Sequence, residues 1–263
     1  MRHRVLIGMV VAGLLAAACT PSSVTSTTAE TAAGSRVPVA STPGGAASST
    51  STSTVTVADR TGSDLVVPED REGLARQYGL YSPDGEYVGP VDSDGRPLVF
   101  EPITGYGDFS DVPYFLLDWQ LVNQREVACM QDHGFDLVLD ADGLGANWAN
   151  VPQEQNNLAL AVAIACHAGL RLPDRVPRTE EQWAELLAYQ IALRDCVASL
   201  GHDVPEPPSL DQFIESNGNW TAYDMVPNLV GPAWDELAKT CPQAPVGGFG
   251  AWNPGDPVRP YQP

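Results

Sequence analysis

Apolar residues recur at intervals of three and four along residues 180–200, which places them on one face of an α-helix. Thr179 and Gln182 have the spacing of a capping box, so we expect the helix to begin there. Gly201 is of the residue type that commonly ends a helix. The pattern therefore predicts a helix with a cysteine on its buried face. The residues of that face are Leu186, Tyr189, Leu193, Cys196 and Leu200.

Three further apolar faces predict three more helices, and each face carries one cysteine. Pro152 and Pro232 suit helix starts, and Pro242 would stop the last helix. The first of these faces is followed by Gly134, which can end its helix. The faces consist of Phe115, Trp119, Val122 and Cys129; of Ala159, Val162 and Cys166; and of Trp234, Leu237 and Cys241.

The helical part of the sequence repeats itself. The order Cys, Gly, Asn-Trp, Val-Pro, Cys occurs in residues 113–172 and again in residues 173–245. Such a recurrence indicates an internal duplication, in which each copy is two helices joined by an irregular loop. Trp148 and Trp220 would cover the cysteines of their copies as core residues.

The segment that precedes the repeat has turn signals. Asp84-Gly85 and Asp94-Gly95 are strong turn dipeptides. Short strand candidates, residues 86–88 and 97–100, lie beside them. Residues 59–112 are therefore predicted as a small, loop-rich β-hairpin cap.

Residues 246–263 are rich in Pro and Gly, so this tail cannot be a helix. It either wraps the domain through its aromatic side chains, Phe249, Trp252 and Tyr261, or is mobile. The predicted fold class is thus mainly α. Two disulfide-pinned helical hairpins arise from the duplication, and the loop-rich β-hairpin segment precedes them.

The first eighteen residues have the layout of a secretory signal peptide. Arg2 and Arg4 precede the uncharged residues 5–18, a stretch too short for a stable membrane span. Cys19 follows small residues at the cleavage site, and this arrangement resembles the lipobox of bacterial lipoproteins. The resemblance implies that Cys19 receives a diacylglycerol, which would anchor the protein at the extracytoplasmic face of the cell membrane.

If the protein is exported, the other four cysteines are expected to form disulfides, because an oxidising compartment favours them. Four cysteines allow three connectivities. The pairs Cys129–Cys166 and Cys196–Cys241 keep the symmetry of the repeat, whereas pairs between the copies would break it. We therefore predict the two bridges within the copies.

Composition excludes several partners. Residues 19–58 consist mostly of Ser, Thr, Ala, Gly, Pro and Val, and we expect a flexible tether. The formal net charge is −19, and Lys239 is the only lysine. Phosphate binding needs clustered Lys and Arg, so nucleic acid is excluded as a partner. Attachment to the membrane would depend on the lipid anchor rather than on a basic patch.

Candidate metal sites are weak. Histidines lie close to three cysteines in the sequence, but disulfide formation would remove the thiolates that zinc or copper needs. Two Asp-x-Asp segments begin like calcium loops but lack the glutamate at position twelve, so turns are expected. We predict no metal and no cofactor. The residues concerned are Cys129 with His133, Cys166 with His167, Cys196 with His202, Asp92 with Asp94, and Asp140 with Asp142.

Catalytic motifs are equally weak. The sequence contains no Gly-x-Ser-x-Gly, Ser-x-x-Lys or His-Glu-x-x-His motif. The acid pairs Glu180-Glu181 and Asp235-Glu236 could serve a glycosidase, but both occupy first helical turns, where acids stabilise the helix dipole. No catalytic residue is predicted.

The Cys-Met-x-x-x-Gly-Phe stretch that begins at Cys129 resembles exported proteins of high-GC Gram-positive bacteria without an assigned activity. The resemblance transfers no catalytic residue. Our leading hypothesis is a non-enzymatic envelope module that binds a protein partner or a small ligand between its two copies. The alternative is a cell-wall hydrolase or other enzyme with convergent carboxylates. A smooth acidic surface, or an apolar groove lined by Trp252 and Tyr261, would favour the binding module.

Overall fold

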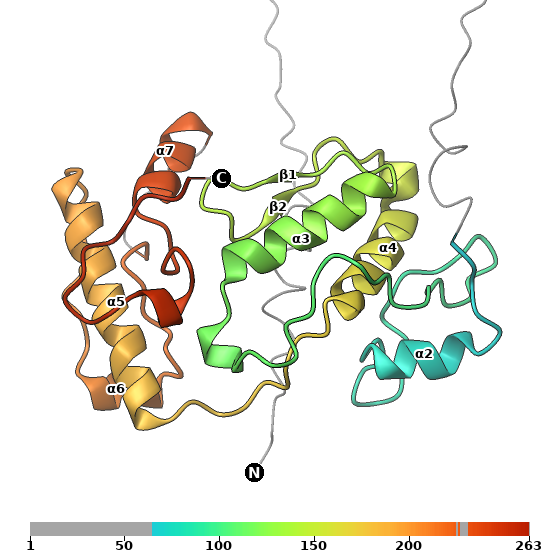
Figure 1. Cartoon of the computed structure of the whole chain (residues 1–263), viewed down its shortest axis with the longest axis horizontal. Helices are drawn as coiled ribbons and strands as arrows, with labels where there is room; N and C mark the ends of the chain where they lie inside the picture. Colours follow the sequence, from blue (N-terminus) through green and yellow to red (C-terminus); the bar gives the residue numbers. More distant parts are fainter. Residues whose placement is uncertain (1–64, 225, 227–230, 263) are drawn as a thin grey trace, which may run out of the picture. The chain divides into compact units, whose positions relative to one another are not determined.

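The computed structural model describes residues 65–224, 226 and 231–262, in which six α-helices and a two-stranded sheet form (Figure 1). The prediction of a mainly helical fold is confirmed. The predicted signal peptide, Cys19 and the predicted tether lie outside the described residues. Among the described helices, none combines the length and the apolar character needed to cross a membrane.

The first copy contains two long helices, α3 (Trp119–Asp132) and α4 (Asn156–Gly169), which pack against each other. Asp118 caps α3, because its carboxylate accepts a hydrogen bond from the Leu121 amide at 3.1 Å. Gly134 follows the helix with a φ of 87°, a conformation that glycine adopts without strain. The chain can therefore turn sharply after α3.

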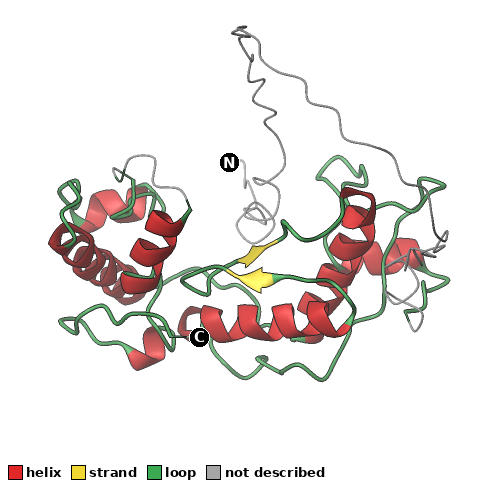
Figure 2. Cartoon of the chain, turned by 90° about the horizontal axis from the view of Figure 1, so that it is seen from above, coloured by secondary structure: helices red, strands yellow, loops and turns green. Residues whose placement is uncertain are grey.

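The loop between these helices contains a short antiparallel hairpin of β1 (Val138–Leu139) and β2 (Ala146–Asn147) (Figure 2). The sequence pattern predicts an irregular loop here, because strands of two residues are too short to show alternation. Trp148 follows β2 and packs against the core that contains Cys129 and Cys166, as predicted.

The second copy contains three helices, α5 (Glu180–Ser199), α6 (Leu210–Glu215) and α7 (Pro232–Thr240). Helix α6 is an unpredicted addition that packs against α5. Its six residues are too few for a helical period to be visible. Ser209 and Gln212 nevertheless form a complete capping box at its start.

The predicted start and end of α5 are confirmed, but its predicted buried face is confirmed only in part, since Leu186 and Cys196 are half-buried. Thr179 forms the capping box, and Gly201 has a φ of 89°. Tyr189 and Leu193 are buried as expected. Leu200, by contrast, is 48% exposed, because the helix has already ended and the chain is turning away.

Both predicted disulfides are present, and both lie within a copy. Cys129 and Cys166 are bridged with their Cα atoms 6.0 Å apart, and Cys196 and Cys241 with their Cα atoms 5.9 Å apart. The bridges close loops of similar length, with sequence separations of 37 and 45 residues. Cys241 directly follows α7 rather than lying inside it.

The tail after Cys241 packs against the helices. Of the two alternatives predicted for it, it therefore wraps the domain through its aromatic side chains. Trp252 and Tyr261 are buried. The Trp252 ring meets the Tyr189 ring edge-on, with the centroids 5.2 Å apart. Trp252 thereby belongs to the core around the second bridge. That place was predicted for Trp220, which lies outside this core, so this prediction is wrong.

The described part of the cap begins with an unpredicted helix, α2 (Arg71–Gln77), which Asp70 caps. The two turn dipeptides are confirmed, but the strand candidates do not pair with each other as one hairpin. Instead, two tight turns follow one another at a spacing of ten residues, with equivalent backbone hydrogen bonds. The hydrogen-bonded pairs are Ser82 with Glu86, Leu80 with Val88, Asp92 with Arg96, and Pro90 with Leu98.

Candidate functional site

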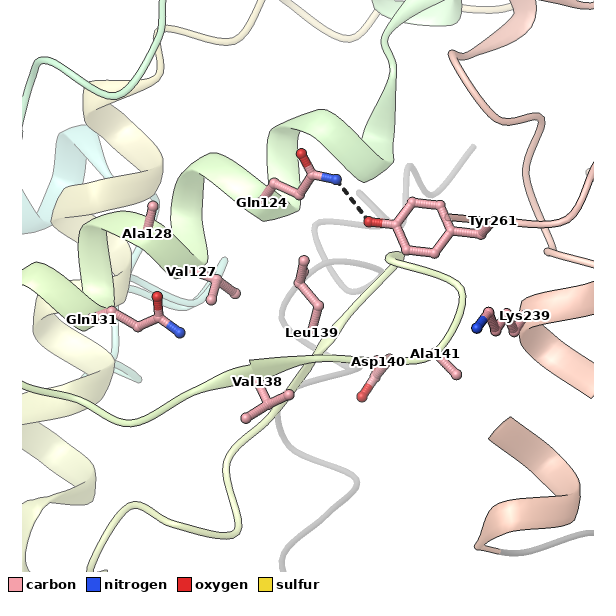
Figure 3. A pocket seen from close by; sticks show the side chains of 10 residues that line it. All are labelled: Gln124, Val127, Ala128, Gln131, Val138, Leu139, Asp140, Ala141, Lys239 and Tyr261. Carbon is pink, nitrogen blue, oxygen red and sulfur yellow. Dashed lines mark hydrogen bonds between the residues drawn. The ribbon is translucent and has the colours of Figure 1, made fainter. Parts of the chain in front are cut away.

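A groove of about 490 Å³ lies between α3 and the β1 strand, and residues from α7 and the tail complete it (Figure 3). Its volume is in the range of small-molecule sites. Most of its lining surface is apolar, although five of the ten lining residues carry polar groups. The lining residues are Gln124, Val127, Ala128, Gln131, Val138, Leu139, Asp140, Ala141, Lys239 and Tyr261.

Helix α3 supplies one wall of the groove because four of its residues share a face. Gln124, Val127, Ala128 and Gln131 follow the spacing i, i+3, i+4 and i+7. Gln131 also fixes the opposite wall, since its amide donates a hydrogen bond to the carbonyl oxygen of Leu137 at 2.7 Å. The helix and the hairpin are therefore held together along the groove.

Tyr261 closes one end of the groove and is fixed by three separate segments. Its hydroxyl accepts a hydrogen bond from the Gln124 side chain of α3 at 2.8 Å (Figure 3). Its amide donates to the carbonyl oxygen of Lys239 at 2.8 Å. Its ring lies against Gly143 of the hairpin turn, where an added Cβ would come within 2.6 Å of the ring. Tyr261 thus joins both copies and the tail at the site.

Lys239 and Asp140 are the two charged groups of the groove. The Lys239 side chain points towards the other lining residues, on the side of Ala141, whereas the Asp140 carboxylate points away from α3 (Figure 3). Burial, together with the charges of Asp142 and Asp235, raises the pKa of Asp140. Among the described residues, no carboxylate forms an ion pair with Lys239.

The Asp140–Asp142 segment forms the turn of the β-hairpin. The Asp140 amide donates to the carbonyl oxygen of Gly145 at 2.9 Å. The Asp142 side chain is buried and accepts hydrogen bonds from the Leu144 amide, at 3.0 Å, and from Gln243. Burial raises the pKa of Asp142, although these hydrogen bonds oppose the rise. Asp142 therefore connects the hairpin to the tail.

The other calcium-like segment, at Asp92, is also a turn. The carboxylate of Asp92 accepts hydrogen bonds from the amides of Arg96 and Asp94, each at 2.9 Å. Arg71 donates to it from the start of α2 at 2.8 Å. The hydrogen bond from the Arg96 amide and the one from Arg71 lower the pKa of Asp92 to about 2. Asp92 therefore serves as the hydrogen-bonding centre of this turn.

Cys129, His133 and Cys166 place potential metal-ligand atoms within 4.8 Å of one another. However, both sulfur atoms belong to the first disulfide and carry no thiolate. The Nδ1 atom of His133 also contacts the carbonyl oxygen of Cys129 at 2.8 Å. In the oxidised protein this cluster offers only the imidazole as a ligand. His202, near Cys196 in the sequence, is not part of such a group in the described residues.

His167 has a structural partner instead of a metal. Its Nδ1 atom lies 2.9 Å from a carboxylate oxygen of Glu126 on the neighbouring helix. Burial disfavours the charged imidazole, but the hydrogen bond and charge of Glu126 outweigh burial and raise the pKa of His167. The pair links α3 to α4 beside the first disulfide.

The two acid pairs proposed for a glycosidase are located at helix starts. Glu180 and Glu181 occupy the first turn of α5, and Asp235 lies in the first turn of α7 with Glu236 beside it. None of the four lines the groove, where Asp140 is the sole carboxylate. The groove therefore does not contain the carboxylate pair that glycoside hydrolysis requires.

The groove itself could not be predicted from the sequence, since its walls, α3 and β1, are completed by Lys239 and Tyr261 from distant segments of the chain. A groove lined by both Trp252 and Tyr261, which would favour a binding module, is not found in the described residues, because Tyr261 lines the groove whereas Trp252 lies in the core. In the composition, the single lysine, Lys239, is the one feature that singles out a residue of the groove. No model of a known protein family, no curated protein and no solved structure matches the chain.

Proposed function

We propose that this protein is a lipid-anchored, extracytoplasmic binding module whose groove takes a small molecule with an elongated apolar part. The observation that carries the proposal is the composition of the groove. Both copies and the tail build an apolar-lined site of about 490 Å³ whose principal end residue, Tyr261, is held by hydrogen bonds. Apolar pockets with a few oriented polar groups are typical of small-molecule sites.

Binding is favoured over hydrolysis because of what lines the groove. A single carboxylate, Asp140, is present, and no serine, cysteine or histidine is among the lining residues. The Ser–His and Cys–His arrangements that activate a nucleophile are therefore missing from the lining of this site. The remaining polar groups, two glutamines, a lysine and a tyrosine, can orient a ligand without reacting with it.

A direct test compares two exposed valines. Val138 lines the groove and is 55% exposed, whereas Val176 lies outside the groove and is 59% exposed. Nile red, an uncharged solvatochromic dye, is the probe. We expect Val138→Asp to weaken dye binding by about threefold, because it adds a charge at the edge of the groove, where the Val138 side chain, like that of Asp140, points away from α3 (Figure 3). Val176→Asp should leave the dye affinity unchanged.

Two results would refute the binding site: no saturable blue shift with the wild-type protein, or equal losses in the two valine variants. Circular dichroism and a urea titration of both variants separate lost binding from lost folding. Because the two positions have similar exposure, a general effect of an added aspartate would act on both.

The location at the extracytoplasmic face of the membrane is proposed from the predicted signal peptide and the disulfides together. The small-residue cleavage site before Cys19 supports lipidation, and two internal bridges are consistent with an oxidising compartment. We expect Cys19→Ser to move the protein from the membrane fraction to the medium or the extracytoplasmic soluble fraction. Membrane retention of this variant would contradict the lipid anchor, without affecting the proposed groove.

A further inference from the structure

We propose that Lys239 recognises an anionic end group, so that the groove takes amphiphiles with an apolar chain and one terminal carboxylate. This inference rests on the proposed binding function and specifies the ligand class. Lys239 and Tyr261 stand at the same end of the groove, beyond the apolar walls of α3 and β1 (Figure 3). A ligand chain lying between those walls would present its head group to this end.

The position of Lys239 is unusual in this chain. It is the only lysine among 263 residues. Six arginines of the described part form ion pairs with carboxylates, so their charges are largely committed to the fold. Lys239 has no such pair among the described residues, and its side chain points towards the groove (Figure 3). Its ammonium can therefore supply hydrogen bonds and charge to a ligand.

Asp140 is the group that could oppose an anion, and its placement limits this effect. Its carboxylate is directed across the hairpin turn, where a Cβ added to Gly145 would come within 2.4 Å of its Oδ2 atom. Figure 3 shows it pointing away from α3. Asp142 and Asp235 are further carboxylates whose charges reach Asp140. Asp142 is buried and its charge is compensated by hydrogen bonds from the Leu144 amide and Gln243, whereas Asp235 is exposed to solvent and to screening by salt. Direct contact with Lys239 should therefore determine the preferred sign of the head group.

The backbone of Lys239 is fixed, while its side chain is exposed. Its carbonyl oxygen accepts the hydrogen bond from the Tyr261 amide at 2.8 Å, which ties α7 to the tail at the end of the groove. The ammonium is therefore carried by an ordered backbone and needs only a side-chain adjustment to meet a carboxylate. Such an arrangement limits the entropy cost of recognition.

The experiment measures displacement of Nile red by three ligands with the same chain: decanoate, decan-1-ol and decylammonium. We expect the wild-type protein to bind decanoate about fivefold more tightly than decanol, the size of effect that a partly exposed ion pair produces. Lys239→Met should remove this preference, and Lys239→Arg should retain it. Arg259→Met is the control, because it removes one positive charge from the exposed tail outside the groove.

The outcomes separate the inference from the proposed function. If Nile red and all three ligands fail to bind, the binding function itself is wrong. If decanol binds but decanoate gains nothing, or if Lys239→Met leaves the preference intact, the role of Lys239 is wrong while the groove stands. Tighter binding of decylammonium than of decanoate would also contradict the role of Lys239. So would a loss of the decanoate preference in Arg259→Met equal to that in Lys239→Met.

Chemical labelling gives an independent measurement on the wild-type chain. Because Lys239 is the only lysine, reductive methylation followed by peptide mass spectrometry reports on its amine without interference from other side chains. We expect saturating decanoate to slow methylation of Lys239 several-fold and decanol to slow it less. Equal rates with and without decanoate would contradict contact between the ammonium and the carboxylate.

Discussion

The two copies share a disulfide and a turn, but their cores are completed in different ways. In the first copy, small and aliphatic residues of α3 and α4 pack directly, and the hairpin covers them. In the second copy, aromatic residues of the tail fill the space beside α5. The duplicated unit thus keeps the bridge and the glycine, while the segments around them have diverged.

The loops differ in the same way. The first copy inserts the β1–β2 hairpin between its helices, whereas the second copy inserts α6. The groove uses the hairpin of the first copy, and α7 and the tail add its end. The groove thus lies where the two copies differ most, since an equivalent groove in the second copy would need a second hairpin and a second tail.

Among the variants that test the difference between the copies, those that lack a disulfide should lose the most free energy of unfolding. Loops of 37 and 45 residues predict a loss of about 4 kcal/mol for either bridge in the chain-entropy description. We expect the double variants Cys129→Ser/Cys166→Ser and Cys196→Ser/Cys241→Ser to lose similar amounts, measured by urea unfolding. A difference above about 2 kcal/mol would show that packing in one copy depends on its bridge far more than loop closure explains.

Trp252→Ala should have the next largest effect and should act on one copy. Truncation of a buried tryptophan costs about 3 kcal/mol or more, because it leaves a cavity. Hydrogen exchange should become faster in α5 and α7 and change little in α4. Phe135→Ala in the core of the first copy is the matched control and should show the opposite pattern. Uniform loss of protection in both variants would mean that the copies unfold as one unit.

The smallest effect concerns the Glu126–His167 pair, which the second copy lacks. The aligned positions there are Leu193 and Pro242. Since the pKa of His167 is raised in the folded state, its stabilisation is complete below pH 6.5 and is lost as the pH rises through the folded pKa. His167 is partly exposed, so we expect about 0.5 kcal/mol. Glu126→Gln should remove this pH dependence from urea unfolding and lower the His167 pKa measured by NMR.

Sequence periodicity predicted the long helices well and the short elements poorly. The extended apolar faces located α3, α4, α5 and α7, because each spans at least two turns. Helices α2 and α6 are too short to show a period, although Asp70 and the Ser209 capping box mark their starts. The strand candidates at residues 86–88 and 97–100 contain only single bridging residues, Tyr87 and Pro97, and the β1–β2 hairpin was not predicted because it has only two residues per strand.

The candidate site was less predictable than the fold. Tyr261 reaches Gln124 across 137 positions of the chain, and no local pattern encodes such a contact. The disulfide pairs, also long-range, could be predicted only because the duplication imposed a symmetry on them. Where the copies differ, as at Trp220 and Trp252, the same symmetry misled.

The pairing of consecutive cysteines has a consequence for how the chain matures. A polypeptide leaves the ribosome or a translocation channel with its N-terminal end first, so Cys129 and Cys166 emerge before Cys196 and Cys241. With the Cys19 thiol blocked by the proposed lipidation, the first pair can be oxidised while the later thiols are still shielded, and the second pair is then left with each other. An oxidant alone should therefore give the native bridges, without an isomerase to correct them.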